Sequence, residues 1–309
     1  WQIPNSAGFI PARGFTTLWF DSNDIAPQNA PFKLDTDGGT IYISDEGGKL
    51  IASQSYPASK ERISYARTTD GGNTWGLAGQ ATPGASNTAG AFATQQLEVP
   101  VVDQPSQLFT GSLSVRVTIP TGSTLRYTDD GTLPTLDNGN TSTDGLFTVS
   151  KTCNYRFRLF ASGKLPSRVT TRSYLLKNKS YTLPVVSVVA DPDFLYDGEI
   201  GVMTEGYNGR PGNGKSYPCN WNMNWERPVN FSYLTPDGKM VLNQDVNLEM
   251  CGGWSRAWTP HSFKLKGTKE MGGTKYLPYQ FFSQKPYIRN RTLQIRNGGN
   301  DNNCRIKDA

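Results

Sequence analysis

Short runs of alternating apolar and polar residues, separated by glycine-rich turns, make up most of this chain and point to a mainly β fold. The clearest run places Leu113, Val115, Val117 and Ile119 on one side of an extended strand. Turns such as Asp-Gly-Gly suit hairpins because glycine accepts a positive φ angle. Long amphipathic helical patterns are nearly absent, while glycine and proline are frequent, at 32 and 20 residues. We therefore expect many short strands and little helix.

The runs and turns divide the chain into modules. We expect one module in residues 1–90, a linker in 91–100, a second module in 101–177 and a third in 178–309. The sequence leading through the linker, TAGAFATQQLEVP, is made of small and polar residues and has no periodicity.

The third module opens with a continuous apolar run typical of a buried strand, Leu183–Ala190. Asp191-Pro192-Asp193 then predicts a turn or the start of a helix, because proline fits the first helical position. The stretch YNGRPGNGKSYPCNWNMN is rich in glycine, asparagine and proline, and we interpret it as a long loop. Further strands are expected in WERPVNFSYL, KMVLNQDVNLEM, HSFKLKG and TLQIRN.

Charge and chain ends limit the classes of function. The net charge of +5 combines an excess of positive charge in residues 96–309 with a small negative excess in residues 1–95. No dense basic run with interleaved aromatic residues occurs, so nucleic-acid binding is not expected. No apolar run approaches the length of a membrane span, so no membrane span is expected in this chain. The chain begins at Trp1 without an apolar leader, and we interpret it as a piece of a longer secreted protein.

The cysteines and the histidine do not indicate a metal site. Cys153, Cys219, Cys251 and Cys304 form no CxxC pair, so zinc is not expected. Buried free thiols are the favoured state, with at most one disulfide in the third module. His261 has no second histidine to share a metal or a catalytic triad, and a packing role is expected.

A glycine turn and a basic strand are the candidate binding elements. Gly252 and Gly253 precede Ser255 and Arg256, and a turn of this kind can offer backbone N–H groups to an anion. Downstream, the run SFKLK places Lys264 and Lys266 on one face of a strand, where they can neutralise phosphate. The alternatives are a tight turn with one exposed arginine and an edge strand whose lysines prevent aggregation.

The third module resembles the N-terminal half of the CotH family of atypical protein kinases. The matching pieces are LPVVSVVADPDFLYD, WERPVNFSYLTPDG, CGGWSRAWTPHSFKLK and RNGGND, in that order. The resemblance implies an α+β kinase-like lobe that binds ATP with Mg²⁺ or Mn²⁺ as cofactors. The family's catalytic and metal-binding aspartates are expected after Ala309, so no catalytic residue is assigned in this chain, its metal ligands stay unknown, and alone it is expected to be inactive.

The resemblance also assigns roles within the module. Lys264 best matches the family's phosphate-binding lysine, with Lys266 second. Arg296, Asn297 and Asp301 are placed at the lip of the nucleotide cleft, although a polar strand end is the alternative. Two further acids, Glu226 and Glu249, are candidates to pair with the lysine, and a surface role is an equal alternative for Glu249.

The first two modules resemble small β-sandwich domains. Ser64-Tyr65-Ala66-Arg67, Trp75 and Thr82-Pro83-Gly84 resemble the close of lamin-tail domains, whose early strands are missing here. The piece LRYTDDGTLPT and a last strand ending at Tyr174 resemble the C-terminal module of chitobiases and hexosaminidases. The full expectation is a mainly β, multidomain chain: two immunoglobulin-like β-sandwiches followed by the kinase-like segment.

These resemblances lead to two hypotheses for the function. In the first, the chain is a fragment of a bacterial, secreted or cell-surface CotH-like kinase that transfers the ATP γ-phosphate to a hydroxyl of a protein substrate. The alternative is a non-catalytic surface protein that binds polysaccharide or partner proteins. In that alternative Trp221 and Trp225 could stack on sugars, although packing beneath the loop is expected for at least one of them.

Overall fold

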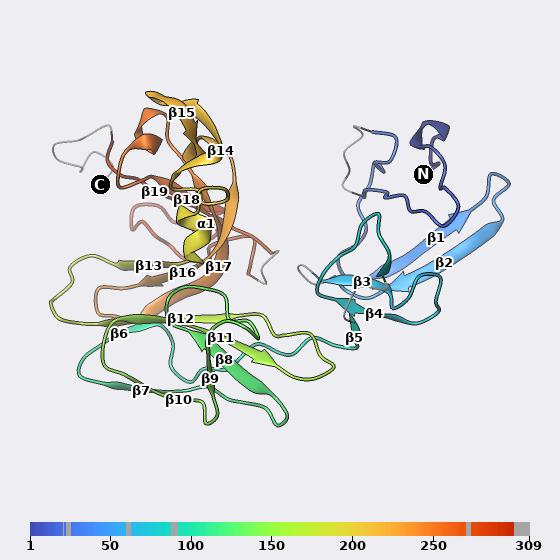
Figure 1. Cartoon of the computed structure of the whole chain (residues 1–309). Helices are drawn as coiled ribbons and strands as arrows, with labels where there is room; N and C mark the ends of the chain where they lie inside the picture. Colours follow the sequence, from blue (N-terminus) through green and yellow to red (C-terminus); the bar gives the residue numbers. More distant parts are fainter. Residues whose placement is uncertain (21, 23–25, 60–62, 88–91, 270–272, 300–309) are drawn as a thin grey trace. The chain divides into compact units, whose positions relative to one another are not determined.

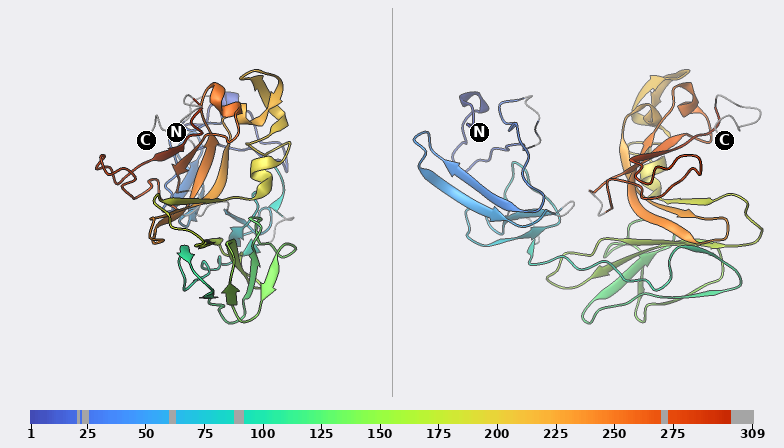
Figure 2. Two further views of the ribbon diagram at one scale, coloured as in Figure 1. Left: turned by 90° about the vertical axis from the view of Figure 1, so that its left-hand side faces the viewer. Right: turned by 180° about the vertical axis from the view of Figure 1, so that it is seen from behind.

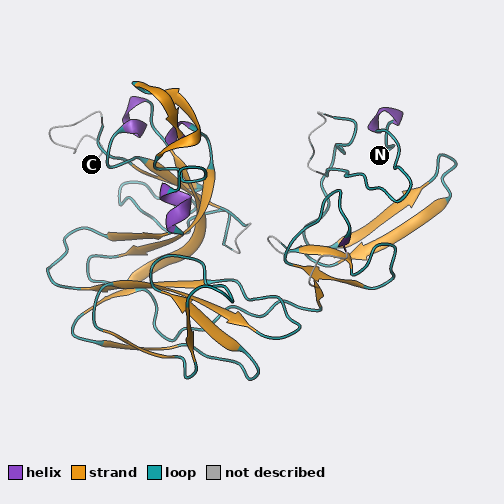
Figure 3. Ribbon diagram, in the orientation of Figure 1, coloured by secondary structure: helices purple, strands orange, loops and turns teal. Residues whose placement is uncertain are grey.

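The computed structural model describes residues 1–20, 22, 26–59, 63–87, 92–269 and 273–299. The chain is mainly β, with several separate sheets and little helix (Figure 3). It forms two compact units: unit 1 comprises Trp1–Leu97 with Ser162–Leu165, and unit 2 comprises Glu98–Ala161 with Pro166–Ala309. In the described ranges, no helix has the length and apolar character needed to cross a membrane.

Unit 1 contains two small antiparallel sheets with little apolar core. One sheet is the pair β1-β2 and the other has the order β3-β4-β5. The strands are Gly39–Ser44 (β1), Leu50–Tyr56 (β2), Ser64–Arg67 (β3), Trp75–Ala78 (β4) and Phe92–Ala93 (β5). A short 3-10 helix, η1, covers Asn5–Ala7. The strand β5 lies inside the segment predicted to be a linker.

The second module is a small sandwich within unit 2. A five-stranded sheet of order β6-β12-β11-β8-β9 faces the pair β7-β10. The strands are Gln107–Phe109 (β6), Leu113–Arg116 (β7), Thr124–Thr128 (β8), Asn140–Ser142 (β9), Leu146–Val149 (β10), Cys153–Phe160 (β11) and Thr170–Leu176 (β12). Aromatic rings join the two sheets: Phe147 on β10 lies 4.9 Å from Tyr127 and 5.2 Å from Phe157, between ring centroids.

The third module is built on a second five-stranded sheet of unit 2, with the antiparallel order β13-β16-β17-β18-β19. Its strands are Val185–Val189 (β13), Glu226–Leu234 (β16), Met240–Met250 (β17), Phe263–Gly267 (β18) and Thr292–Ile295 (β19). One face carries the apolar core, which includes Phe231, Val246, Leu248 and Leu265. The α+β character of a kinase lobe is not evident in this mainly β arrangement.

Two local predictions in this module had different outcomes. The predicted helix start is confirmed: α1 covers Pro192–Tyr196, and the Asp191 side chain caps it by accepting a hydrogen bond from the Asp193 N–H. The predicted long loop is wrong, because it contains a hairpin, Glu205–Gly212 (β14) and Lys215–Cys219 (β15), and the 3-10 helix Asn220–Asn222 (η3). Closely spaced glycines concealed these strands, since glycine is depleted in most strands.

The sandwich and the third module meet along β12, β13, β16 and β17 through polar side chains. The hydroxyls of Ser173 and Ser187 lie 2.8 Å apart, and the Asn243 amide donates to the Ser232 hydroxyl at 2.7 Å and to the Thr171 carbonyl at 3.4 Å. Figures 1 and 2 show the long strand β17 curving along this junction. The face of β17 opposite the apolar core is therefore a polar surface, buried in part against β12.

Candidate functional site

The glycine turn follows β17 directly and is held by Arg256. Gly252 has a φ of 100°, and a Cβ there would lie 2.6 Å from the Ser255 hydroxyl, so the turn requires glycine at this position. The short 3-10 helix Trp254–Ala257 (η4) follows. Arg256 Nε donates to the Gly252 carbonyl at 2.7 Å, and its Nη1 donates to the Trp221 carbonyl at 3.2 Å. Arg256 thus fixes the conformation of the turn.

Asn297 connects the same turn to the end of β19. It is buried, its side chain donates to the Ser255 carbonyl at 2.9 Å, and its backbone N–H donates to the Ser262 hydroxyl at 3.0 Å. Gly299 packs closely here, since a Cβ would lie 2.5 Å from Ser255 Cβ. The structure therefore brings Gly252, Ser255, Arg256 and Asn297 together. Asp301, predicted beside them, lies outside the described residues.

The two lysines of β18 have different partners. Lys266 forms ion pairs with Glu226 on β16 and with Glu249 on β17, the latter at 2.9 Å. Hydrogen bonds to these carboxylates raise the pKa of Lys266. Lys264 lies opposite Glu249 in the strand register, and within the described chain its side chain makes no hydrogen bond or ion pair. The lysine that pairs with the two predicted acids is thus Lys266, while Lys264 keeps its ammonium available to an external anion.

The thiol of Cys251, at the end of β17, is influenced by charges from three neighbouring segments. Burial raises the pKa of the Cys251 thiol, the positive charges of Lys264, Arg256 and Arg296 oppose that rise, and the negative charge of Glu249 adds to it. Lys264 belongs to β18, Arg256 to η4, and Arg296 follows β19. Positive charges of this kind can attract a phosphate group.

The described residues do not assemble a metal site. No group of three His, Cys, Asp or Glu side chains gathers among them. The described cysteines, Cys153, Cys219 and Cys251, are free thiols, and Cys304 lies outside the described residues.

The tryptophans proposed as sugar-stacking platforms belong instead to the packing of the third module. Trp221 is 5% exposed within the apolar core, so the packing expected for at least one of the two tryptophans is confirmed. Trp225 packs against the same core and carries the guanidinium of Arg227 over its ring at 5.0 Å. The packing role expected for His261 agrees with its ring lying 5.2 Å from that of Trp221.

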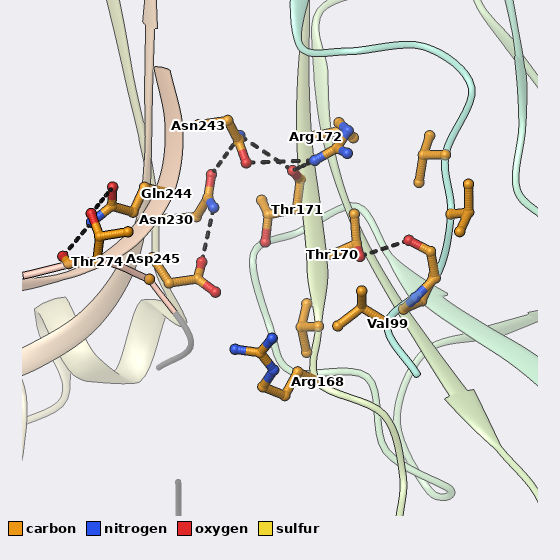
Figure 4. A pocket seen from close by; sticks show the side chains of 15 residues that line it. Val99, Arg168, Thr170, Thr171, Arg172, Asn230, Asn243, Gln244, Asp245 and Thr274 are labelled. Atoms are coloured by element: carbon orange, nitrogen blue, oxygen red, sulfur yellow. Dashed lines mark hydrogen bonds between the residues drawn. The ribbon is translucent and has the colours of Figure 1, made fainter. Parts of the chain in front are cut away.

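A polar cavity at the junction of sandwich and third module was not predicted from the sequence. Its volume is about 530 Å³, and its lining includes Asp245, Asn230 and Asn243 from the third module and Arg168 and Arg172 from the sandwich (Figure 4). The signal was present in β17, where Asn243, Asp245, Asn247 and Glu249 alternate with apolar residues. Alternation predicts a polar face, but it does not say what that face contacts.

Comparison with known proteins gives no further assignment. No family model matches the sequence, and no curated protein matches it. The interpretation of the site therefore depends on its geometry and on the motifs given above.

Proposed function

We propose that the third module is the phosphate-binding half of a CotH-like protein kinase, in which the complete enzyme transfers the ATP γ-phosphate to a protein hydroxyl. The observation that carries the proposal is that Arg256 and Asn297, from segments about 40 residues apart, are both hydrogen-bonded to the glycine turn, at the Gly252 and Ser255 carbonyls. The charges of Lys264, Arg256 and Arg296 also act on the Cys251 thiol just before this turn. Positioning and charge neutralisation are the main contributions a protein makes to phosphoryl transfer.

The neighbouring ion pairs support the same interpretation. Lys266 bridges Glu226 and Glu249, which holds β16, β17 and β18 together just beside Lys264. In this arrangement Lys264 is the residue that contacts phosphate, while Lys266 and Arg256 are positioning residues. The two N-terminal modules would anchor the enzyme or present its protein substrate at the surface of a bacterial cell.

The test measures the thermal stability of the chain with and without ATP and Mg²⁺. A ligand that binds the folded state raises the melting temperature, and at 100 times its Kd it adds about 2.7 kcal/mol to the unfolding free energy. We expect a rise that is lost in Lys264→Ala and retained in Lys239→Ala, an exposed lysine in the turn between β16 and β17. Equal shifts in both variants, or no shift in the unmodified chain, would contradict phosphate binding at Lys264.

A further inference from the structure

The segment between β18 and β19 contains a loop whose two ends are joined. Leu277 and Asn290 form an isolated antiparallel bridge, in which the Leu277 N–H donates to the Asn290 carbonyl at 2.7 Å. The Asn290 side chain also donates to the Tyr279 carbonyl at 2.8 Å. The chain from residue 277 to residue 290, called the 277–290 loop below, therefore returns to its starting point, as a compact surface loop does.

The first part of this loop is anchored in the core of the third module. Leu277 is completely buried. The rings of Tyr279 and Phe281 pack against the same core, with centroids 5.2 and 5.1 Å from that of Tyr233. Because aromatic contacts hold these side chains, the base of the loop has a defined position, and the residues that follow are presented from a fixed support.

The rest of the loop exposes large apolar side chains. Every residue from 282 to 289 is exposed, and the exposed fractions of Phe282, Tyr287 and Ile288 are 54%, 66% and 60%. The Lys285 N–H donates to the Phe282 carbonyl at 3.0 Å, which makes a tight turn between them. Single exposed apolar residues are ordinary on a protein surface, but three of them in one closed loop form a patch, and such patches mark interaction sites.

The charges in and beside this patch have one sign. From residue 273 to residue 299 the chain has no acidic residue and five cationic ones, which are Lys275, Lys285, Arg289, Arg291 and Arg296. Lys285 and Arg289 belong to the exposed part of the loop. Among the residues that the structure describes, no acid forms an ion pair with either of them. The apolar patch is therefore flanked by positive charge that an anionic partner would complement.

Aromatic rings order these cations. The guanidiniums of Arg289 and Arg291 both lie over the ring of Tyr276, at 4.5 and 5.9 Å from its centroid, and the ammonium of Lys285 lies 5.7 Å from the centroid of Phe282. A guanidinium has five N–H donors and an ammonium has three, so stacking over a ring leaves donors for an external acceptor. The cations are thus placed beside the apolar side chains without being consumed by the fold.

The combination of apolar side chains and cations favours an anionic lipid surface. Aliphatic and aromatic side chains such as Ile288 and Phe282 gain free energy when they leave water for the boundary of the acyl chains. A tyrosine ring suits the level of the headgroups, and lysine and arginine are attracted to anionic lipids. A nucleic acid would engage the cations and the rings, but it offers no apolar medium for Ile288.

We propose that the 277–290 loop docks the chain on a membrane surface that carries anionic lipids. Phe282, Tyr287 and Ile288 enter the boundary between headgroups and acyl chains, and Lys285 and Arg289 contact the lipid phosphates. The alkyl chain of Lys285 can lie along the apolar patch while its ammonium stays at the headgroups. This docking does not depend on the nucleotide binding proposed above.

The experiment measures how the full chain sediments with vesicles of phosphatidylcholine alone and with vesicles of an equimolar mixture of phosphatidylcholine and phosphatidylglycerol. We expect binding to the mixed vesicles to be at least about tenfold tighter, because each cation near an anionic surface contributes roughly a fivefold factor. Ile288→Asn and Lys285→Gln are each expected to weaken that binding by about fivefold. The matched controls, Leu136→Asn and Lys239→Gln, change exposed residues elsewhere in unit 2 and are expected to bind normally.

The other occupants of this surface give different results. Equal binding to both kinds of vesicle, or binding to neither, overturns the proposal. Retained binding of Ile288→Asn to mixed vesicles, with its folding verified by circular dichroism, also overturns it, since charge attraction alone would then explain the binding. A single-stranded oligonucleotide that binds the chain when mixed vesicles do not would assign the loop to nucleic acid. A dimer that Ile288→Asn converts to a monomer, without vesicle binding, would assign it to a second copy of the chain.

Discussion

At the scale of single residues, Asp245 links the cavity to stability. Because burial raises its pKa in the folded state, its ionisation weakens the fold, and the arginines around it offset this only in part. The folded state is favoured most below the ordinary aspartate pKa, about 3.9, and loses stability as pH rises through the raised value. We expect Asp245→Asn to raise the melting temperature at pH 7 and to have little effect near pH 3.

The control for this prediction is Asp237→Asn. Asp237 lies in the turn between β16 and β17, and a hydrogen bond from Thr235 lowers its pKa. Replacing this carboxylate is therefore expected to lower the melting temperature at pH 7, opposite to the change expected for Asp245→Asn. Thermal melts of both variants across this pH range measure the difference. A destabilised Asp245→Asn at pH 7 would show that the charged carboxylate is satisfied by its partners in the folded protein.

Lys266 and Lys264 provide a second comparison at the residue scale. Removal of Lys266 leaves Glu226 and Glu249 directly opposite each other on β16 and β17 without a cation between them. We expect Lys266→Met to lower the unfolding free energy by about 1 kcal/mol, since the pair is partly exposed and screened by solvent. Lys264→Met breaks no ion pair, so its unfolding free energy is expected to stay within about 0.5 kcal/mol of that of the unmodified chain. Urea unfolding measures both variants. A larger loss of stability in Lys264→Met than in Lys266→Met would contradict the assignment of Lys266 as the ion-paired lysine.

At the scale of elements, the sequence predicted strands well where apolar alternation is strict. The strand in SFKLK was found with the correct faces, because Leu265 is buried and Lys264 and Lys266 lie on the other side. The β14-β15 hairpin was missed because its glycines and asparagines carry no apolar pattern. The choice between Lys264 and Lys266 as the ion-paired lysine depends on which acids lie on neighbouring strands, and local sequence does not contain that register.

The β1-β2 hairpin of unit 1 is expected to be the least stable sheet. Most of its residues are exposed on both faces, and an isolated pair of strands is only marginally stable in water. By contrast, β11 and β12 are paired on both sides and bury Phe157 and Tyr174 completely. We predict that amides of residues 39–56 exchange with deuterium at least about 100-fold faster than those of 153–176. Equal protection in mass-spectrometric exchange would mean that another surface covers the hairpin.

At the scale of the whole molecule, the two units differ in their cores. The buried apolar side chains found in the described part of unit 1 are Ala30, Ala78, Ala93 and Leu165, whereas unit 2 buries many large ones. Module boundaries near residues 90–100 were accessible from composition, because small polar residues interrupt the alternation there. The sequence did not predict that the second and third modules share one compact unit. Their junction consists of hydroxyl and amide contacts, and such contacts leave no apolar pattern in the sequence.

This difference predicts how the chain melts. The large apolar residues and the sheets that bury them lie in unit 2, so we expect one cooperative transition in differential scanning calorimetry, with an enthalpy of about 0.7 kcal/mol for each residue of unit 2 near 60 °C. Unit 1 is expected to melt earlier, with little heat. Serine and asparagine side chains join the sandwich to the third module. Asn243→Leu is therefore expected to lower the melting temperature of unit 2, because it removes the amide that donates to the Ser232 hydroxyl and the Thr171 carbonyl. Separate high-temperature transitions for residues 101–177 and 178–309 would show that this junction is too weak to couple them.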